Sequence, residues 1–292
     1  MKSDAEYATK PTPVNSSQTN IQLDLVRLRS ICNASIDDLM AMGEVRGSKG
    51  ARHSFIDNGS DILAVAHLDT VQNGTHFQIV DLDKEVLVFN PRLDDRLGVY
   101  TILKLLPTMG INVDVLLTEN EEIGQTTASD FDTEKQYNWM VEFDRHDSDV
   151  VSYDYGLSDD WDNILKEHFR VGLGSFSDIS ELEHLGCKAI NIGVGYYREH
   201  SHRAHFIVGE YKAQIAKFVN FHEAWGSTLF EHSERLGYRD RWAPYNDDSE
   251  LLETVYYCDW CDELYYESQI LPANNGSLCP GCWRVLTSED EV

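Results

Sequence analysis

The chain has 292 residues, of which 42% are hydrophobic, so it is long enough to enclose a sizeable core in one large domain or two smaller ones. Its 50 acidic and 24 basic residues give a formal net charge of −26, and such a surface repels nucleic-acid phosphates and anionic membranes. No apolar stretch approaches the ~20 residues of a membrane span, and the first 20 residues hold no apolar signal-peptide core. We therefore expect a cytoplasmic protein without a membrane or nucleic-acid partner.

Local periodicity divides the chain into elements. Residues 1–20 are rich in Ser, Thr, Pro and Asn, and we expect a flexible arm. Apolar positions with helical spacing predict helices at 21–31, 98–106, 161–169, 177–186 and 209–225, with Pro107 as the stop of the second. Continuous or alternating apolar runs predict strands at 61–67, 113–120, 138–144 and 188–194, and two strands around a tight turn within 77–90.

The order of these elements indicates a fold class. Helices that alternate with short, continuously apolar strands are typical of an α/β domain with a mainly parallel sheet sandwiched by helices. Ligands in such sheets bind at the carboxyl ends of the strands. His67 ends the first of these strands, and Asp69 follows it. Glu121 and Glu122 follow the strand at 113–120, and Asp144 ends the strand at 138–144. We expect these side chains to gather at one edge of the sheet.

The residue types in this set favour a metal site. Imidazole and carboxylate groups are ligands of zinc and similar divalent ions. The pair Asp94 and Asp95, and His200 in YYREHS, add further ligands. Three carboxylates and two histidines suffice for two ions when one carboxylate bridges them. Two such ions ~3.5–4 Å apart lower the pKa of a shared water and stabilise a developing oxyanion.

The motifs, taken in order, resemble those of a known superfamily, the co-catalytic di-zinc exopeptidases, which include zinc aminopeptidases and carboxypeptidases. They are HLD at 67–69, LDDRLG at 93–98, ENEEIG at 119–124, EFD at 142–144 and YYREHS at 196–201. The resemblance covers roughly residues 60–225, and the short gaps are similar to those of the compact branch without a lid domain. It implies a di-zinc hydrolase domain over residues 21–225.

The resemblance also implies the metal ligands. His67 and Asp144 would bind one zinc ion, and Glu122 and His200 would bind the other. Asp94 would bridge the two ions.

Four further residues receive roles from the resemblance. Asp69 would hold the far ring nitrogen of His67. Glu121 would be the general base that takes a proton from water and returns it to the leaving amine. Ser177 and Asp178 resemble a family segment that lines the substrate cleft.

Some assignments stay open at this point. The alternatives are Asp147 and Asp149 in place of Asp144, and His202 and His205 in place of His200. Asp95 precedes a predicted helix and could serve as a cap, because Asp accepts backbone N–H hydrogen bonds at that position.

The C-terminal part reads as a separate module. Residues 226–250 are charged and weakly periodic, and we expect a linker before a module at 251–292. The module holds two CxxC pairs separated by 17 residues, Cys258 with Cys261 and Cys279 with Cys282. This spacing is typical of a structural zinc ribbon. A module of about 40 residues has too small a hydrophobic core to be stable without a bound metal ion or a similar cross-link. Its acidic and aromatic sequence favours a protein partner over nucleic acid.

These observations together predict a zinc metallopeptidase that acts on a peptide or small amide substrate. Its cofactors would be two catalytic zinc ions and one structural zinc ion. Two alternatives remain: a relative with altered chemistry, such as a cyclase or a non-peptide hydrolase, and an acidic scaffold that uses the zinc ribbon to bind a protein.

Overall fold

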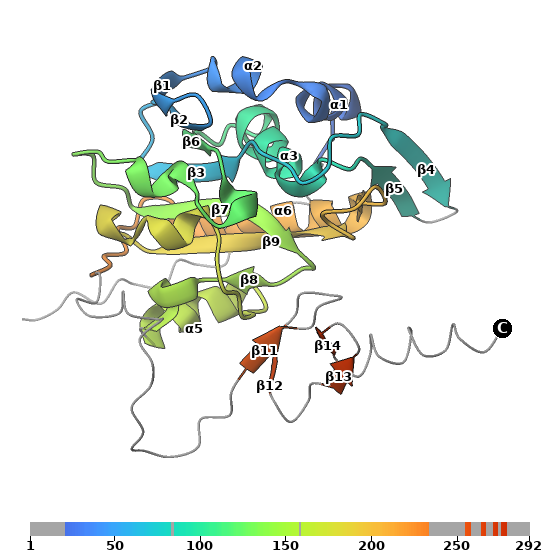
Figure 1. Cartoon of the computed structure of the whole chain (residues 1–292). Helices are drawn as coiled ribbons and strands as arrows, with labels where there is room; N and C mark the ends of the chain where they lie inside the picture. Colours follow the sequence, from blue (N-terminus) through green and yellow to red (C-terminus); the bar gives the residue numbers. More distant parts are fainter. Residues whose placement is uncertain are drawn as a thin grey trace, which may run out of the picture. The chain divides into compact units, whose positions relative to one another are not determined.

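The computed structural model describes residues 21–82, 85–157 and 159–233, together with four three-residue strands near the C-terminus (Figure 1). The chain divides into two compact units, Met1–Glu234 and Arg235–Val292. In the second unit, β11 (Val255–Tyr257) pairs with β12 (Leu264–Tyr266), and β13 (Leu271–Ala273) pairs with β14 (Gly276–Leu278), both antiparallel. The expected arm at 1–20 and the four CxxC cysteines lie outside the described residues. None of the helices in the described part is long and apolar enough to cross a membrane.

The first unit is built on a mixed sheet of ten strands within the described residues. Its strands run in the order β1 (Glu44–Ser48), β2 (Ala51–Ile56), β6 (Asp114–Thr118), β3 (Ile62–His67), β7 (Trp139–His146), β9 (Ala189–Tyr197), β10 (His205–Ile207), β5 (Glu85–Phe89) and β4 (Gln78–Leu82), while β8 (Val150–Val151) pairs with β9. The central strands β6, β3, β7 and β9 are parallel, and the strands on both flanks pair antiparallel. The expected α/β class is therefore confirmed, with parallel pairing concentrated at the centre.

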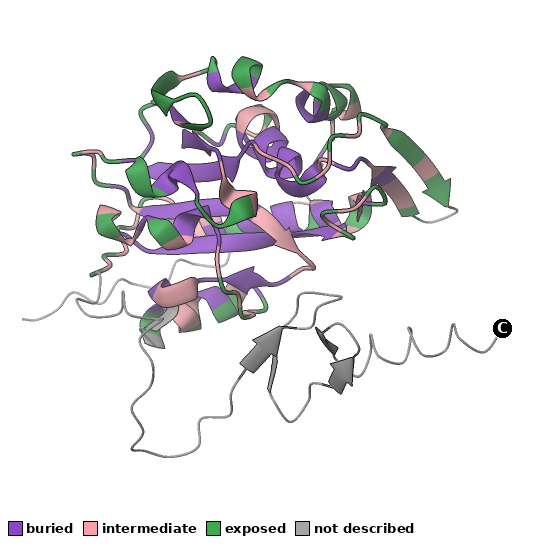
Figure 2. Cartoon of the chain, in the orientation of Figure 1, coloured by how far each residue is buried: buried purple, intermediate pink, exposed green. Residues whose placement is uncertain are grey.

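Side chains along the central strands point alternately to the two faces of the sheet and belong to two separate hydrophobic clusters. On β3, Leu63 and Val65 belong to one buried cluster, while Ala64 and Ala66 belong to the other. His67 continues the first set and faces the same side, because side chains on a strand alternate. Figure 2 shows β3, β7 and β9 as mostly buried strands. Burial on both faces explains why these segments read as continuous apolar runs.

Different elements cover the two faces. The α-helices α1 (Leu25–Asn33), α3 (Leu93–Tyr100) and α6 (Val208–Trp225) contribute to the larger cluster, where the ring of Phe218 packs against Trp139 and Phe143. The opposite face is covered by short 3₁₀ helices, including η3 (Thr127–Asp130), η5 (Asp178–Glu181) and η6 (Glu183–Leu185). The candidate site lies on this second face.

Several sequence expectations need correction. The helix expected at 21–31 begins at Leu25 because the side chain of Asp24 caps it. The helix expected at 177–186 is two 3₁₀ helices that end at Gly186, and the helical run from Leu93 continues past Pro107 to Thr108.

The expected linker also starts later than residue 226. Phe230 exchanges backbone hydrogen bonds with Asn138 and Lys188, so residues 226–233 belong to the first unit. The ring of Phe230 packs on Trp161 and Trp225.

The hairpin β1–β2 and strands β8 and β10 were not expected. All five residues of β1 are exposed, so no buried face produces an alternating pattern there. Strands β8 and β10 span two and three residues, too few for any period to show.

Candidate metal centre

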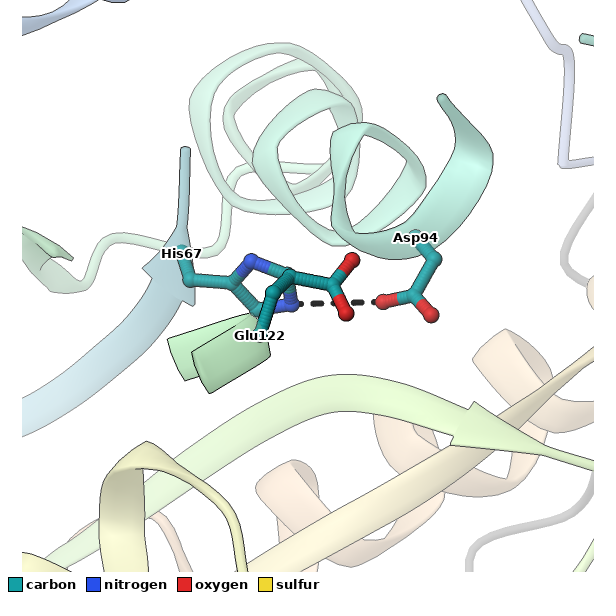
Figure 3. Close-up of side chains that lie close together, drawn as sticks. All are labelled: His67, Asp94 and Glu122. Carbon is teal, nitrogen blue, oxygen red and sulfur yellow. Dashed lines mark hydrogen bonds and ion pairs between the residues drawn. The ribbon is translucent and has the colours of Figure 1, made fainter. Parts of the chain in front are cut away.

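Five chain segments deliver the expected ligands to one edge of the sheet. His67 is the last residue of β3, and Asp144 lies near the carboxyl end of the neighbouring parallel strand β7. Asp94 lies at the start of α3, where its φ and ψ are not helical. Glu122 is in η2 (Glu121–Ile123), the turn that follows β6, and His200 is in the loop after β9. Figure 3 shows His67, Asp94 and Glu122 converging from three separate elements.

Asp94 lies between the two histidines. Its Oδ1 is 3.2 Å from Nε2 of His67, and its Oδ2 is 2.9 Å from Nε2 of His200. Asp144 Oδ2 is 3.5 Å from the same nitrogen of His67, and Glu122 Oε2 is 2.9 Å from that of His200. Two sets of ligand atoms therefore share one carboxylate.

The ligand atoms fit divalent metal ions. Two atoms bound to one tetrahedral zinc ion at about 2.0–2.2 Å are separated by about 3.3–3.6 Å. The observed separations of 2.9–3.5 Å are near this value. His67 also groups with Asp94 and Glu122, and separately with Glu121 and Asp144, as ligand atoms all within 4.8 Å of one another. Nitrogen and carboxylate oxygen together are a donor set that suits zinc.

Asp69 holds His67 differently from the expectation. Nδ1 of His67 donates to the backbone carbonyl oxygen of Asp69 at 3.0 Å, whereas the carboxylate oxygen is 3.6 Å away. The carboxylate instead accepts the backbone N–H of Glu122 at 3.2 Å. Because Nδ1 carries the proton, Nε2 of His67 has its lone pair free for a metal ion.

Other residues fix Asp144 and start the helix behind Asp94. Tyr196 donates its hydroxyl to Asp144 at 2.6 Å, and the amide of Asn191 brackets the backbone of Asp144 with two hydrogen bonds. The Asp95 carboxylate accepts the backbone N–H of Gly98 at 3.0 Å, which is the capping contact expected for this residue. Tyr196 and Asn191 were not expected as site residues.

The charges at the centre are strongly coupled. Burial and the negative charge of Asp94 raise the pKa of Asp144 to about 6. Hydrogen bonds to Asp94 and Glu122 raise the pKa of His200 to about 11. Burial opposes ionisation of Asp94, but the contacts with His200 and His67 lower its pKa below the usual range. The cluster is short of positive charge, which divalent cations would provide.

Glu121 differs from its neighbour Glu122. Its Oε2 is 3.8 Å from Nε2 of His67, farther than the oxygens of Asp94 and Asp144 are from the same nitrogen. Burial raises the pKa of Glu121 to about 9, and the negative charges of Asp144 and Asp178 add to this effect. A carboxylate at the edge of the ligand set, with a raised pKa, is suited to carrying a proton.

The four residues that the sequence left open as alternative metal ligands make other contacts. Asp149 pairs with Arg145 at 2.7 Å and Asp147 faces His146, so both carboxylates serve the turn after β7. His202 is exposed beside Gly74, and His205 stacks on Phe89 within β10.

A partly buried ion pair anchors the loop that carries Glu121 and Glu122. Arg52 on β2 donates to both carboxylate oxygens of Glu119, at 2.7 and 3.3 Å, and its backbone N–H donates to one of them at 2.9 Å. Thr127 closes the same loop by accepting the N–H of Glu119 and donating to the carbonyl oxygen of Arg52. The partners are 67 residues apart, so no local pattern in the sequence indicates this pair.

The segment with Ser177 and Asp178 packs on the same face of the sheet. Asp178 is buried and accepts hydrogen bonds from the hydroxyls of Thr118 and Thr126, which fixes it above the end of β6. Glu142 of β7 is fully buried, and its pKa is raised well above the usual range by burial and by the charges of Asp178 and Asp144. Glu142 was read only as part of a buried strand.

Comparisons with known proteins place the fold. No protein-family model and no curated protein sequence matches the chain. A tripeptidase from Staphylococcus aureus is similar in structure with a TM-score of 0.51 at 9% identity, over 69% of this chain and 97% of that one. A TET aminopeptidase from a marine-sediment thaumarchaeotal archaeon (TM-score 0.49, 12% identity, 70% and 96% covered) and aminopeptidase PepT from Bacillus cereus (TM-score 0.46, 12%, 68% and 96%) are similar to a lesser degree. The likeness to the tripeptidase shows that the two chains share an α/β fold.

Proposed function

We propose that this chain is a di-zinc metallohydrolase that cleaves a peptide bond at the end of a peptide. One observation carries the proposal: the two oxygens of Asp94 face Nε2 of His67 and Nε2 of His200, at 3.2 and 2.9 Å. A carboxylate shared between two ligand sets is the arrangement that a pair of metal ions needs. The similar tripeptidase carries a peptidase name on the same fold, which supports the choice of a peptide substrate.

The residues divide the work by position. His67 and Asp144 would hold one ion, Glu122 and His200 the other, and Asp94 both. When bound, the ions would activate water and stabilise the negative charge that develops on the scissile carbonyl oxygen. Oε2 of Glu121 would accept a proton from the attacking water and pass it to the leaving amine.

The second unit is proposed to hold a structural zinc ion. In the sequence, Cys258 directly follows β11 and Cys279 directly follows β14, and both strands belong to antiparallel hairpins. Hairpins that lead into CxxC pairs are typical of a zinc ribbon. We propose that this module binds a protein partner, since its sequence is acidic and aromatic. The buried free thiols of Cys32 and Cys187 fit a reducing compartment such as the cytoplasm.

Two neighbouring glutamates provide the test. Glu121→Gln should retain two catalytic metal ions and lower turnover about 10²–10⁴-fold, because only the proton carrier is lost. Glu122→Gln should lose one ion, since a neutral amide is a poorer zinc ligand than a carboxylate. The measurements are metal content by elemental analysis and hydrolysis of di- and tripeptides.

The two variants control for each other because they differ by one position in the same turn. If Glu121→Gln loses metal while Glu122→Gln retains it, Glu121 would be the metal ligand and Glu122 the proton carrier. Equal, slow hydrolysis of every peptide by the wild type and both variants would end the hydrolase proposal and favour the scaffold.

A further inference from the structure

One carboxyl group beneath the metal centre has no partner. Glu142 lies on β7 two residues before Asp144, so both side chains point to the same face of the sheet. Glu142 is 0% exposed, and neither of its carboxyl oxygens makes a hydrogen bond. Burying a carboxyl group without hydrogen bonds is costly, so its retention needs a physical reason.

The side chains that influence Glu142 include the hydroxyl of Ser177 and the carboxyl groups of Asp178 and Asp144. The hydroxyl of Ser177 lies beside Glu142 and is also buried. The nearest negative charge is Asp178, whose oxygens already accept hydrogen bonds from Thr118 and Thr126. A group of one hydroxyl and two carboxyls is suited to a positively charged hydrogen-bond donor.

A metal ion fits this place less well than an organic cation. Among the described residues, the groups of three metal-type ligands within 4.8 Å all include His67, and none includes Glu142. A primary ammonium group needs fewer ionised partners, because it donates three hydrogen bonds that one carboxylate and neutral oxygens can accept.

The depth of Glu142 indicates which ammonium group could reach it. Two residues along a regular strand correspond to about 6.6 Å, which is the upper limit for the rise between Glu142 and Asp144 because β7 is irregular between Glu142 and Arg145. An extended lysine side chain spans about 6 Å from Cα to its nitrogen, whereas an α-amino nitrogen is only about 2.5 Å from the carbonyl carbon of the same residue. With the scissile carbonyl at the metal centre, a side-chain ammonium group matches this depth and the α-amino group does not.

We propose that Glu142, Ser177 and Asp178 form a subsite that binds the primary ammonium group of a substrate side chain. The chain would then favour peptides with lysine, or a residue like it, at the cleaved bond. The inference rests on the proposed peptidase function, since it places the scissile carbonyl at the metal centre. The net charge of −26 adds to it, because an acidic surface attracts cationic peptides.

Access to the subsite requires a local movement. Glu142 and Ser177 are 0% and 1% exposed, so an entering side chain has to displace the segment at 172–177. This segment contains no helix or strand and includes Gly172 and Gly174. Leu173 within it is 73% exposed, so the segment is not held by a buried side chain at that position.

The test measures binding instead of turnover. The full chain carrying Glu121→Gln is loaded with zinc and titrated calorimetrically with lysyl-alanine and with norleucyl-alanine, whose side chain lacks the ammonium group. Lysyl-alanine should bind about 10- to 100-fold more tightly, as expected for hydrogen bonds to a charged buried group. Adding Glu142→Gln should remove this preference, and Ser177→Ala should reduce it about 3- to 10-fold.

A matched control and two blocked peptides identify the group that binds. Glu181→Gln removes an exposed acid from the same 3₁₀ helix as Asp178 and should leave the preference intact. Nε-acetyl-lysyl-alanine should lose the preference, whereas Nα-acetyl-lysyl-alanine should keep its dependence on Glu142. The opposite result would place the α-amino group in the subsite and overturn the assignment.

Other outcomes separate this inference from the proposed function. Equal affinity for the lysyl and norleucyl peptides, or equal loss of both in Glu142→Gln, would overturn the subsite even if the wild type hydrolyses peptides. A lysyl preference that depends on Glu142 would support the subsite even if the wild type hydrolyses none of them. Circular dichroism of each variant confirms that the fold is kept, and Ser177→Ala provides the test if Glu142→Gln does not fold.

Discussion

The ion pair between Arg52 and Glu119 should be the main anchor of the catalytic loop, and Glu119→Ala tests this. The side chain of Glu119 is 6% exposed and that of Arg52 is 16% exposed. Removing one partner of a fully buried pair costs about 3–5 kcal/mol, whereas an exposed pair contributes about 0–1 kcal/mol. Arg52 keeps a second contact, with Asp37 at 2.7 Å, and one exposed edge. We therefore expect a loss of about 2 kcal/mol.

A loss of this size is measurable in the metal-free chain. For a unit of this length, about 2 kcal/mol corresponds to a decrease in Tm of about 4–8 °C. The matched control is Glu44→Ala, which removes a pair with Arg46 at 3.0 Å whose side chains are 66% and 48% exposed. This control should lower Tm by less than about 4 °C.

The same variant should disturb the metal centre, because Glu119 lies two residues before Glu121. Zinc affinity of the catalytic site should fall about 10-fold, the lower end of the effect of losing a contact behind a metal ligand. Equal decreases in Tm for Glu119→Ala and Glu44→Ala would refute the burial argument. A decrease in Tm with unchanged zinc affinity would show that the pair stabilises the fold without positioning the loop.

Three further predictions concern the metals. Tyr196→Phe removes the 2.6 Å hydrogen bond to Asp144 and should weaken zinc binding about 10- to 100-fold in competition with a chromophoric chelator; unchanged affinity would contradict this role. The pKa of His200 is raised to about 11, so its protonated form stabilises the metal-free chain fully below about pH 6.5 and loses this contribution as pH rises through 11. Because zinc has to displace this proton, the zinc affinity measured by calorimetry should increase from about pH 6 to about pH 9. A zinc affinity that does not change with pH would contradict this prediction. Elemental analysis should find up to three zinc ions per chain, Cys258→Ser should remove one of them, and deletion of residues 251–292 should leave two; a single ion that disappears in Cys258→Ser would contradict the di-metal centre.

The sequence predicted the central sheet and the ligand positions for a physical reason. Strands β3, β6 and β7 are buried on both faces, so they appear as continuous apolar runs, and polar residues at their ends stand out. His67 and Asp144 fall at such ends, and parallel pairing brings these ends together. The flanking hairpin β1–β2 has an exposed first strand and leaves no such pattern.

The contacts that support the site were beyond the sequence. Tyr196 and Asp144 are 52 residues apart, and Arg52 and Glu119 are 67 residues apart. Nothing in the local pattern around either residue indicates its partner, because the packing of the sheet decides which side chains meet. The role of Asp69 also depended on the three-dimensional structure, since its carbonyl oxygen is closer to Nδ1 of His67 than its carboxylate is.

The partners of the buried carboxyl groups indicate which of these groups could determine substrate preference. Asp94, Glu122 and Asp144 would neutralise three of the four charges of two divalent ions, as metal ligands. Asp69 accepts a backbone N–H, Asp178 accepts two threonine hydroxyls, and Asp95 caps a helix. Within the described residues, Glu142 is the buried carboxyl whose two oxygens both lack a hydrogen bond. Metal binding and folding account for the others, so the carboxyl group of Glu142 is the part of the proposed site that a cationic substrate would complete.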